Sequence, residues 1–177
     1  ETPSGKLIRT YRSPQGYFLT DPKFIGEDSV VAAARRPDGT MALMLIKQDS
    51  EELLTPFLPY SVGFPQHHQG AIYFSAGFAN NDNLYMYKLS EKKLYSLIEG
   101  GLGKYQVHVT SNRIYWSEQQ AEGYQLRSLS IDSLQVKEFD LSIIKAIGAP
   151  KVAYQQTTEK WTQFSNVKGL YPVQPYA

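Results

Sequence analysis

The chain has 177 residues, enough for one domain with a sizeable core, and 42% of them are hydrophobic, as in an ordinary globular protein. Its 18 Lys and Arg against 17 Asp and Glu give a net charge of +1, which argues against a nucleic-acid-binding protein with a basic face. Cysteine is absent, which excludes disulfides, zinc–thiolate sites and a catalytic thiol. No apolar run approaches the roughly 20 residues that a membrane-spanning helix needs. The chain begins at Glu1 rather than Met, from which we expect a piece of a longer protein.

The first repeat unit is predicted at residues 19–60, after a lead-in segment at 1–18 that mixes Gly, Pro, Ser and basic residues. Pro37-Asp38-Gly39 is a strong turn signal between two apolar runs. The second of these runs is apolar from Met41 to Ile46, as in a strand that is covered on both faces. Four strands are therefore expected, at 18–24, 30–34, 40–46 and 52–55.

The second unit, at 61–103, and the third, at 104–141, repeat this order. In the second unit an inner strand at 62–64 and a turn at 65–70 precede strands at 71–76, 84–89 and 93–97. In the third unit the strands are expected at 105–110, 114–118, 124–130 and 134–139. Residues 142–147 carry a weak helical signal, and residues 142–177 as a whole are expected to form a tail or linker that packs on the repeats.

The predicted strands recur at a regular spacing along the chain. Ile72-Tyr73-Phe74-Ser75 returns as Ile114-Tyr115-Trp116-Ser117, and Val30–Ala34 stands the same distance before the first of these. A period of about 40–45 residues with several short strands per unit is typical of β-propeller blades. The sequence therefore predicts an all-β fold, a partial β-propeller of about three four-stranded antiparallel blades with irregular termini. Phe74 and Trp116 are expected at equivalent buried positions.

Three units cannot close a ring, because natural propellers contain about 4–8 blades. The first and last sheets are then each left with an uncovered face. The run Ile114–Trp116 indicates apolar residues on both faces of the last sheet, and wet apolar surface is unfavourable. Aromatic side chains near both termini are suited to cover these faces, unless further blades or self-association of the chain do so: Tyr11, Tyr17, Trp161, Phe164 and Tyr171.

The second unit resembles the WD40-like repeats of the TolB-type β-propeller. The resemblance rests on Ala71–Ser75, Asp82–Tyr85, Leu94-Tyr95 and Gly101–Tyr105, and it extends over residues 19–140. Of the Ser-Pro-Asp-Gly turn that is usual in this family, only Arg36-Pro37-Asp38-Gly39 is similar. The chain looks closest to the propellers of Bacteroidetes-type cell-envelope proteins, which precede an outer-membrane barrel or accompany a peptidase-like region. The resemblance implies a binding or scaffolding role in the periplasm or cell envelope.

Two candidate ligand-binding residues lie on the inner strand of the third unit. His108 alternates with Gln106 and Thr110, so these side chains are expected on one side of the strand, opposite Tyr105 and Val107. Polar residues on an inner strand can face the central channel of a propeller. Gln106 and His108 are therefore candidates for binding a ligand, and a hydrogen-bonded structural histidine is the alternative.

Three further candidates have weaker support. His67 and His68 are adjacent in the turn predicted at 65–70, which makes a poor metal pair, and solvated turn residues are the alternative. Lys104 follows Gly100-Gly101-Leu102-Gly103, which has the composition of a phosphate loop. Its spacing is wrong and no helix follows, so the segment is expected to connect two units. No metal and no cofactor are expected.

The sequence contains no motif for a catalytic nucleophile, since a Gly-x-Ser-x-Gly elbow is missing. The first hypothesis is therefore a non-catalytic interaction or scaffold module of a larger bacterial envelope protein, which binds a protein or another envelope component. A second hypothesis is the propeller portion of a peptidase that positions substrate for a catalytic domain outside this chain. A third is a carbohydrate-binding or carbohydrate-active propeller that uses His108 and the His67-His68 turn with a metal.

Overall fold

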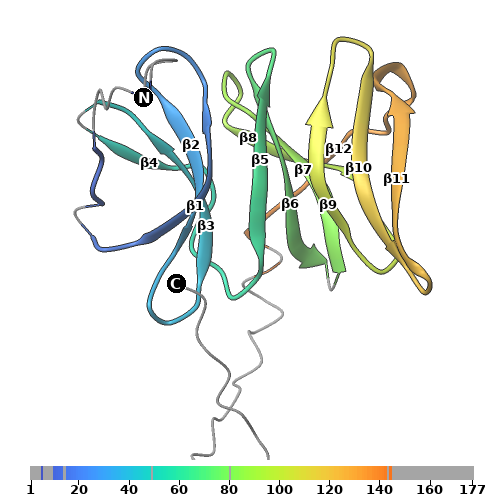
Figure 1. The fold of residues 1–177 in the computed structure, drawn as a ribbon, viewed down its shortest axis with the longest axis horizontal. Helices are drawn as coiled ribbons and strands as arrows, with labels where there is room; N and C mark the ends of the chain where they lie inside the picture. Colours follow the sequence, from blue (N-terminus) through green and yellow to red (C-terminus); the bar gives the residue numbers. More distant parts are fainter. Residues whose placement is uncertain are drawn as a thin grey trace, which may run out of the picture.

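The computed structural model describes residues 5, 10–13, 15–48, 50–79, 81–142 and 144. These residues form three antiparallel sheets that stand side by side in chain order (Figure 1). The first sheet has the order β1 (Phe18–Phe24), β2 (Val30–Arg35), β3 (Met41–Ile46) and β4 (Glu51–Leu53). The predicted all-β fold of repeated antiparallel sheets is therefore confirmed.

The second sheet has five strands and the third has three. In the second sheet the order is β12 (Lys137–Glu138), β8 (Lys93–Ile98), β7 (Asn81–Lys88), β6 (Ala71–Ala79) and β5 (Val62–His68). In the third sheet the order is β11 (Gly123–Ser130), β10 (Arg113–Gln120) and β9 (Lys104–Val109). The strict count of four strands per sheet thus holds only for the first sheet. Of the predicted helical stretch at 142–147, only Ser142 and Ile144 are described, and both are helical.

The inner strand of the second unit is longer than predicted. β5 continues to His68, and His67 and His68 pair with Ile72 and Ala71 of β6. The turn is confined to Gln69 and Gly70, which both have positive φ angles, 46° and 76°. The expectation of a turn from residue 65 to 70 was therefore wrong, because polar side chains do not prevent a strand from pairing when its backbone fits the ladder.

Two apolar cores lie between the sheets. Phe74 and Tyr85 of the second sheet pack against Val31 and Leu43 of the first, while Trp116 of the third sheet packs against the other face of the second. Phe74 and Trp116 are both buried, and each faces the sheet that precedes its own. Their predicted equivalence is confirmed. Burial between sheets is the main apolar stabilisation available, since no sheet encloses a core by itself.

The far face of the first sheet is covered by its own chain. Ala32, Ala34, Met44 and Ile46 form a small cluster there, and the partly buried Tyr11, Tyr17, Leu19 and Phe57 pack against it. The Tyr11 hydroxyl donates a hydrogen bond to Glu51, and the Arg36 guanidinium lies 3.8 Å from the centre of the Phe57 ring. The expected covering by Tyr11 and Tyr17 is confirmed, whereas Trp161, Phe164 and Tyr171 lie outside the described residues.

The free face of the third sheet is more polar than expected. Arg113 and Tyr115 point away from the second sheet, because Ile114 and Trp116 point into the core with it. The Arg113 guanidinium donates a 2.7 Å hydrogen bond to Ser128 on the same face. The free face is therefore mixed: Tyr115, Tyr124 and Leu126 lie on it as the expectation of apolar residues on both faces required, together with this hydrogen-bonded pair.

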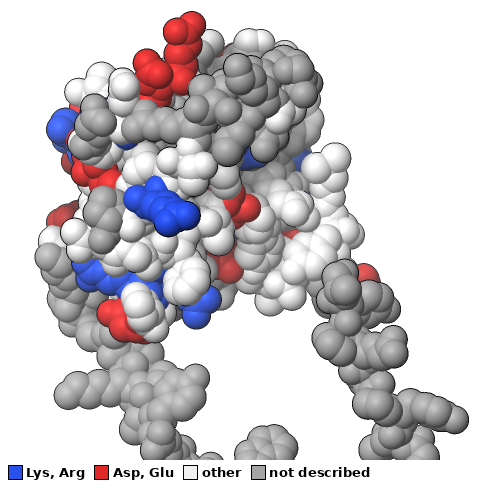
Figure 2. Space-filling model, turned by 60° about the vertical axis from the view of Figure 1, so that its left-hand side comes forward, with Lys and Arg blue, Asp and Glu red and all other residues white. Residues whose placement is uncertain are grey.

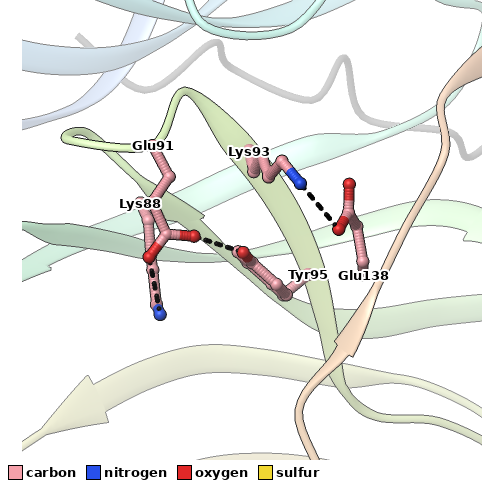
Figure 3. Close-up of polar contacts among 5 residues, drawn as sticks. All are labelled: Lys88, Glu91, Lys93, Tyr95 and Glu138. Carbon is pink, nitrogen blue, oxygen red and sulfur yellow. Dashed lines mark hydrogen bonds and ion pairs between the residues drawn. The ribbon is translucent and has the colours of Figure 1, made fainter.

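The segment after β11 crosses to the second sheet instead of adding a fourth strand to the third. It passes through a short 3₁₀ helix, η1 (Ile131–Ser133), and β12 then pairs with β8. An ion pair of 2.9 Å joins Lys93 to Glu138, beside the contacts of Glu91 with Lys88 and Tyr95 (Figure 3). The reason for the crossing is aromatic packing: the Phe139 ring lies 5.1 Å from that of Tyr85 and 6.1 Å from that of Phe78.

We expect Phe74→Ala to lower the free energy of unfolding by about 3–5 kcal/mol, because the side chain is 0% exposed between two sheets. Urea denaturation of purified protein measures this loss. Phe18→Ala is the control: Phe18 is exposed at the start of β1, and its removal should change stability by less than about 0.5 kcal/mol. Similar losses for the two variants would contradict the assignment of Phe74 to the core.

A second prediction concerns alkaline pH. Burial and the contact with Glu51 raise the pKa of Tyr11 from 10.0 to about 12. The folded state therefore holds this proton more tightly than the unfolded state, so its stabilising effect is complete below pH 10.0 and is lost as the pH rises toward about 12. We expect Tyr11→Phe to lose less stability than the wild type over that interval in urea titrations. Ser128→Ala, in the third sheet and remote from the Tyr11–Glu51 pair, should retain the wild-type slope.

Candidate functional site

The first strands of the three units, β1, β5 and β9, share one unusual backbone feature. Asp21 of β1, Phe64 of β5 and Gln106 of β9 have left-handed φ angles of 52°, 54° and 53°, and one of them stands in each repeat unit. At each of them the pairing register of the strand shifts, which marks a β-bulge. A left-handed conformation costs a residue other than glycine about 1–2 kcal/mol. Recurrence of such strain at three equivalent positions shows that it belongs to the repeat.

The residues that follow the bulges suit the inner edge of a sheet. Pro22 and Pro65 come directly after Asp21 and Phe64. Proline has no backbone N–H to donate, so within sheets it is confined to edge strands and bulges. Each proline therefore occupies a place where a strand can lose one ladder bond without harm.

The three bulges lie around one hollow, which we call the inner groove. Its volume is about 260 Å³, and β1, β5 and β9, which contact one another in sequence order, all contribute to it. The inner groove presents a carboxylate, an ammonium group, two amides, an imidazole and an apolar floor. It is lined by Asp21, Lys23, Phe64, Pro65, Gln66, Gln106, Val107 and His108.

Contacts between neighbouring inner strands hold the inner groove in shape. The Asp21 carboxylate accepts a 3.3 Å hydrogen bond from the backbone N–H of Phe64. The Phe64 ring meets the Tyr105 ring edge-on, with centroids 6.4 Å apart. Burial and a hydrogen bond to Asp82 raise the pKa of Tyr105 to about 12, so its hydroxyl stays protonated at neutral pH. A hydrogen bond and a ring contact thus link the three sheets at the groove, and neither involves the side chains of Lys23, Gln66 or Gln106.

Several groups in the inner groove have no partner within the described chain. The side chains of Lys23, Gln66 and Gln106 make no hydrogen bond or ion pair with any described residue. A second hollow, of about 350 Å³ between the first two sheets, differs in this respect. There Glu52 pairs with Lys47 and Lys92, each at 3.1 Å, so the charges satisfy one another. Free polar groups that converge on a hollow are what a binding site requires, which favours the inner groove.

Of the five residues proposed from the sequence, two lie in the inner groove. Gln106 and His108 both line it, as the inner-strand argument suggested. The expected alternation holds for Val107, which is buried between the exposed Gln106 and His108, but it fails at Tyr105. Tyr105 pairs with Ser117 and His108 with Tyr115, so Tyr105 and His108 share a face, because the bulge at Gln106 inserts one extra residue between them.

The other three residues do not line the inner groove. His67 and His68 lie near the end of β5, where burial and the neighbouring His68 lower the pKa of His67. Lys104 is 2% exposed, its Nζ lies 3.7 Å from Glu118 Oε1, and it also donates to the carbonyl of Gly100. The ammonium group of Lys104 is therefore used inside the fold, between the connection at 99–103 and the third sheet.

Sequence reasoning missed the contribution of the first two units to the inner groove. Asp21-Pro22 and Phe64-Pro65 stand at equivalent places in the first and second units, and this repeated pair of a residue and a proline was the available signal. Because the bulge cannot be recognised in the sequence, Pro65 was interpreted as the start of a turn. Lys23 and Gln66 follow these pairs at the same offset and enter the groove with them.

Two features are missing from the described residues. No group of three or more His, Cys, Asp or Glu side chains in that part of the chain is arranged to hold a metal ion. His67, His68 and His108 thus do not form the metal cluster that the carbohydrate hypothesis required. Within the same residues, no helix has the length and apolarity to cross a bilayer.

Strain at the third bulge leads to a stability prediction. We expect the order of stability Gln106→Gly ≥ wild type > Gln106→Val, because glycine relieves the left-handed strain and a β-branched residue increases it. Gln125→Gly on β11 is the matched control, since Gln125 is exposed with ordinary extended backbone. It should lose about 0.5–1 kcal/mol in urea unfolding. An equal loss for glycine at both positions would contradict the strained bulge.

Comparisons with known proteins give the fold a name. No protein-family model matches the chain, and no curated protein matches it either. TolB from Acinetobacter baumannii matches with a TM-score of 0.48 and 12% identity, over 63% of this chain and 29% of that one. A putative TolB from Agrobacterium tumefaciens matches with a TM-score of 0.53 and 14% identity, over 63% of this chain and 44% of that one. The matched part thus spans less than half of that protein, and the described sheets have the fold of a TolB-type β-propeller.

Proposed function

We propose that this chain is a non-catalytic binding module, and that the inner groove receives a short segment of a protein partner. The observation that carries the proposal is the threefold recurrence of a strained bulge around one hollow. Strained backbone persists where the surrounding structure requires it, and it is concentrated at functional sites. The three units would then share one task, and the ligand would contact all three sheets at once.

The chemistry of the inner groove favours a peptide. Peptide groups offer one donor and one acceptor each, and the primary amides of Gln66 and Gln106 offer both in return. Lys23 adds a donor beside a carbonyl or carboxylate, and Phe64 adds an apolar contact for a side chain. The groove contains no serine, threonine or cysteine, so its side chains supply no hydroxyl or thiol nucleophile.

The charge distribution is against nucleic acid as the ligand. Lys23 and Asp21 lie in the same groove and offset each other, and the whole chain has a net charge of +1. On the face shown in Figure 2, basic and acidic side chains are interspersed and form no extended patch of one sign. Neutralisation of a phosphate backbone requires a continuous basic surface.

We place the module in a larger bacterial envelope protein, in the periplasm or at the cell surface. Support for this comes from the TolB-type fold, and the Bacteroidetes-type envelope proteins that the repeats resemble are its proposed relatives. The partial coverage of the Agrobacterium TolB fits a chain that is one part of such a protein. A role in positioning substrate for a peptidase domain elsewhere would use the same groove and the same ligand chemistry.

The proposal can be tested with amide chemical shifts. The ¹⁵N-labelled chain is titrated with a pool of acetylated, amidated tripeptides and, separately, with a pool of neutral disaccharides. We expect the peptides to shift the backbone signals of Lys23, Gln66 and His108. The double variant Gln106→Ala/His108→Ala should weaken this response about ten-fold, and the control Gln125→Ala/His67→Ala, outside the groove, should not.

Three outcomes would contradict the proposal. Shifts at the groove with disaccharides alone would favour the carbohydrate-binding hypothesis. Hydrolysis of the peptides during the titration, lost in the double variant, would show that the chain is an enzyme. Peptide shifts confined to residues outside the three inner strands would place the binding site elsewhere.

A further inference from the structure

The third sheet lacks the strand that its neighbours have at the outer edge. β4 closes the first sheet, and β8 occupies the same place in the second. After β11 the chain leaves the third sheet through η1 and adds β12 to the outside of β8. Among the described residues, the position of a fourth strand beside β11 is therefore vacant.

The vacant edge is long and regular. β11 pairs with β10 at eight consecutive positions, from Arg113 with Ser130 to Gln120 with Gly123, and no register shift interrupts the ladder. It contains no proline, and six of its eight residues are exposed. An edge strand directs its unpaired N–H and C=O groups outward, where they are ready to pair with another extended chain.

Every other sheet edge in the described structure is protected. Natural proteins protect edges with bulges, prolines, short strands and charges. β1, β5 and β9 each have a bulge, β4 has three residues and β12 has two. The protecting residues are Pro22, Pro65, Gln106, Glu51 and Glu52. Bulges or very short strands interrupt the other five edges, whereas β11 has neither and carries only the single charge of Arg127, so we take the open edge as a functional feature.

One side of this edge is apolar. Leu126 is 79% exposed and Tyr124 is 66% exposed, both on the face that points away from the second sheet. The Tyr124 ring lies edge-on to that of Tyr105, with centroids 6.0 Å apart. Leu84, which occupies the place of Leu126 in the preceding repeat unit, is 0% exposed. Leu84 is covered by the third sheet and pairs with Ile98 of β8, and an incoming strand with apolar side chains on this face would supply the second of these neighbours to Leu126.

The other side of the edge is basic at its centre. Arg127 is 47% exposed, and its Nε donates a 3.0 Å bond to Glu118, which leaves the outer guanidinium nitrogens for a second carboxylate. A second copy of the chain paired antiparallel about Leu126 would bring two Arg127 side chains diagonally together, and like charges oppose such pairing. Residues 145–177 carry four Lys and one Glu, so charge also disfavours the tail of this chain.

We propose that the β11 edge binds an extended, acidic segment of a partner protein as the fourth strand of the third sheet. Backbone hydrogen bonds to β11 would provide affinity. Alternate side chains would provide specificity: apolar residues over Tyr124 and Leu126, and a carboxylate beside Arg127. This surface is separate from the inner groove, and the proposal does not depend on what the groove binds.

The test uses the full chain and two labelled peptides. The first is fluorescein-Val-Thr-Val-Glu-Val-Thr-Val-amide, and the second has Lys in place of Glu. Fluorescence anisotropy measures binding, and hydrogen–deuterium exchange locates it. We expect the Glu peptide to bind about ten-fold more tightly than the Lys peptide and to slow amide exchange within β11. Arg127→Glu should reverse the preference, whereas Arg113→Glu, one strand further in, should keep it.

Four results would overturn the proposal. The first is no binding of the Glu peptide, and the second is binding that slows exchange outside β11. The third is that wild type and Arg127→Glu show the same ratio of affinities for the Glu and Lys peptides. The fourth is slow exchange, before any peptide is added, of those β11 amides that point away from β10. In a chain that sediments as a dimer this would identify a second copy at the edge, and in a monomer it would identify the tail of the chain itself.

Discussion

Mutual burial of neighbouring sheets is the interaction on which the structure depends. None of the three sheets has a core of its own, so the apolar residues of β2, β3, β6 and β7 gain free energy only when another layer covers them, at about 25 cal/mol per Å². Ala32, Phe74 and Trp116 occupy equivalent positions in the three units and all face the N-terminal side of their sheets. The two large rings meet a neighbouring sheet, whereas the small alanine leaves room for the aromatic side chains of the preceding segment.

The central strands could be predicted from the sequence because they carry this interaction. Apolar and aromatic runs that recur once per unit gave β1, β2, β3, β6, β7, β8, β10 and β11 to within a few residues. Two expectations failed for reasons that no local pattern contains. β5 continues past Pro65 because a bulge makes a proline acceptable at an inner edge. β12 joins the second sheet because Phe139 meets Phe78 and Tyr85, residues that belong to the preceding unit of the chain.

Only part of the candidate site could be predicted from the sequence, again because the rest depends on features that no local pattern contains. An inner-strand argument is enough to select Gln106 and His108, since it needs only the order of strands. The contribution of Asp21, Phe64 and Gln66 depends on bulges, which are a matter of backbone conformation. These bulges serve two ends at once, because they end the regular ladder at an inner edge and also place side chains in the groove. Burial elsewhere in the sheets offsets the strain that they contain.

The two ends of the array solve the problem of the missing neighbour differently. At the first sheet, aromatic residues from the chain itself cover an apolar face. At the third sheet the face has changed: Ala71 and Met86, which face the next sheet in the second unit, are replaced at the equivalent positions by Arg113 and Ser128, joined by a 2.7 Å hydrogen bond. This part of the face needs no cover, whereas Tyr124 and Leu126 on the same face are exposed. What the third sheet lacks among the described residues is therefore a cover for Tyr124 and Leu126 and a partner for the outward N–H and C=O groups of β11.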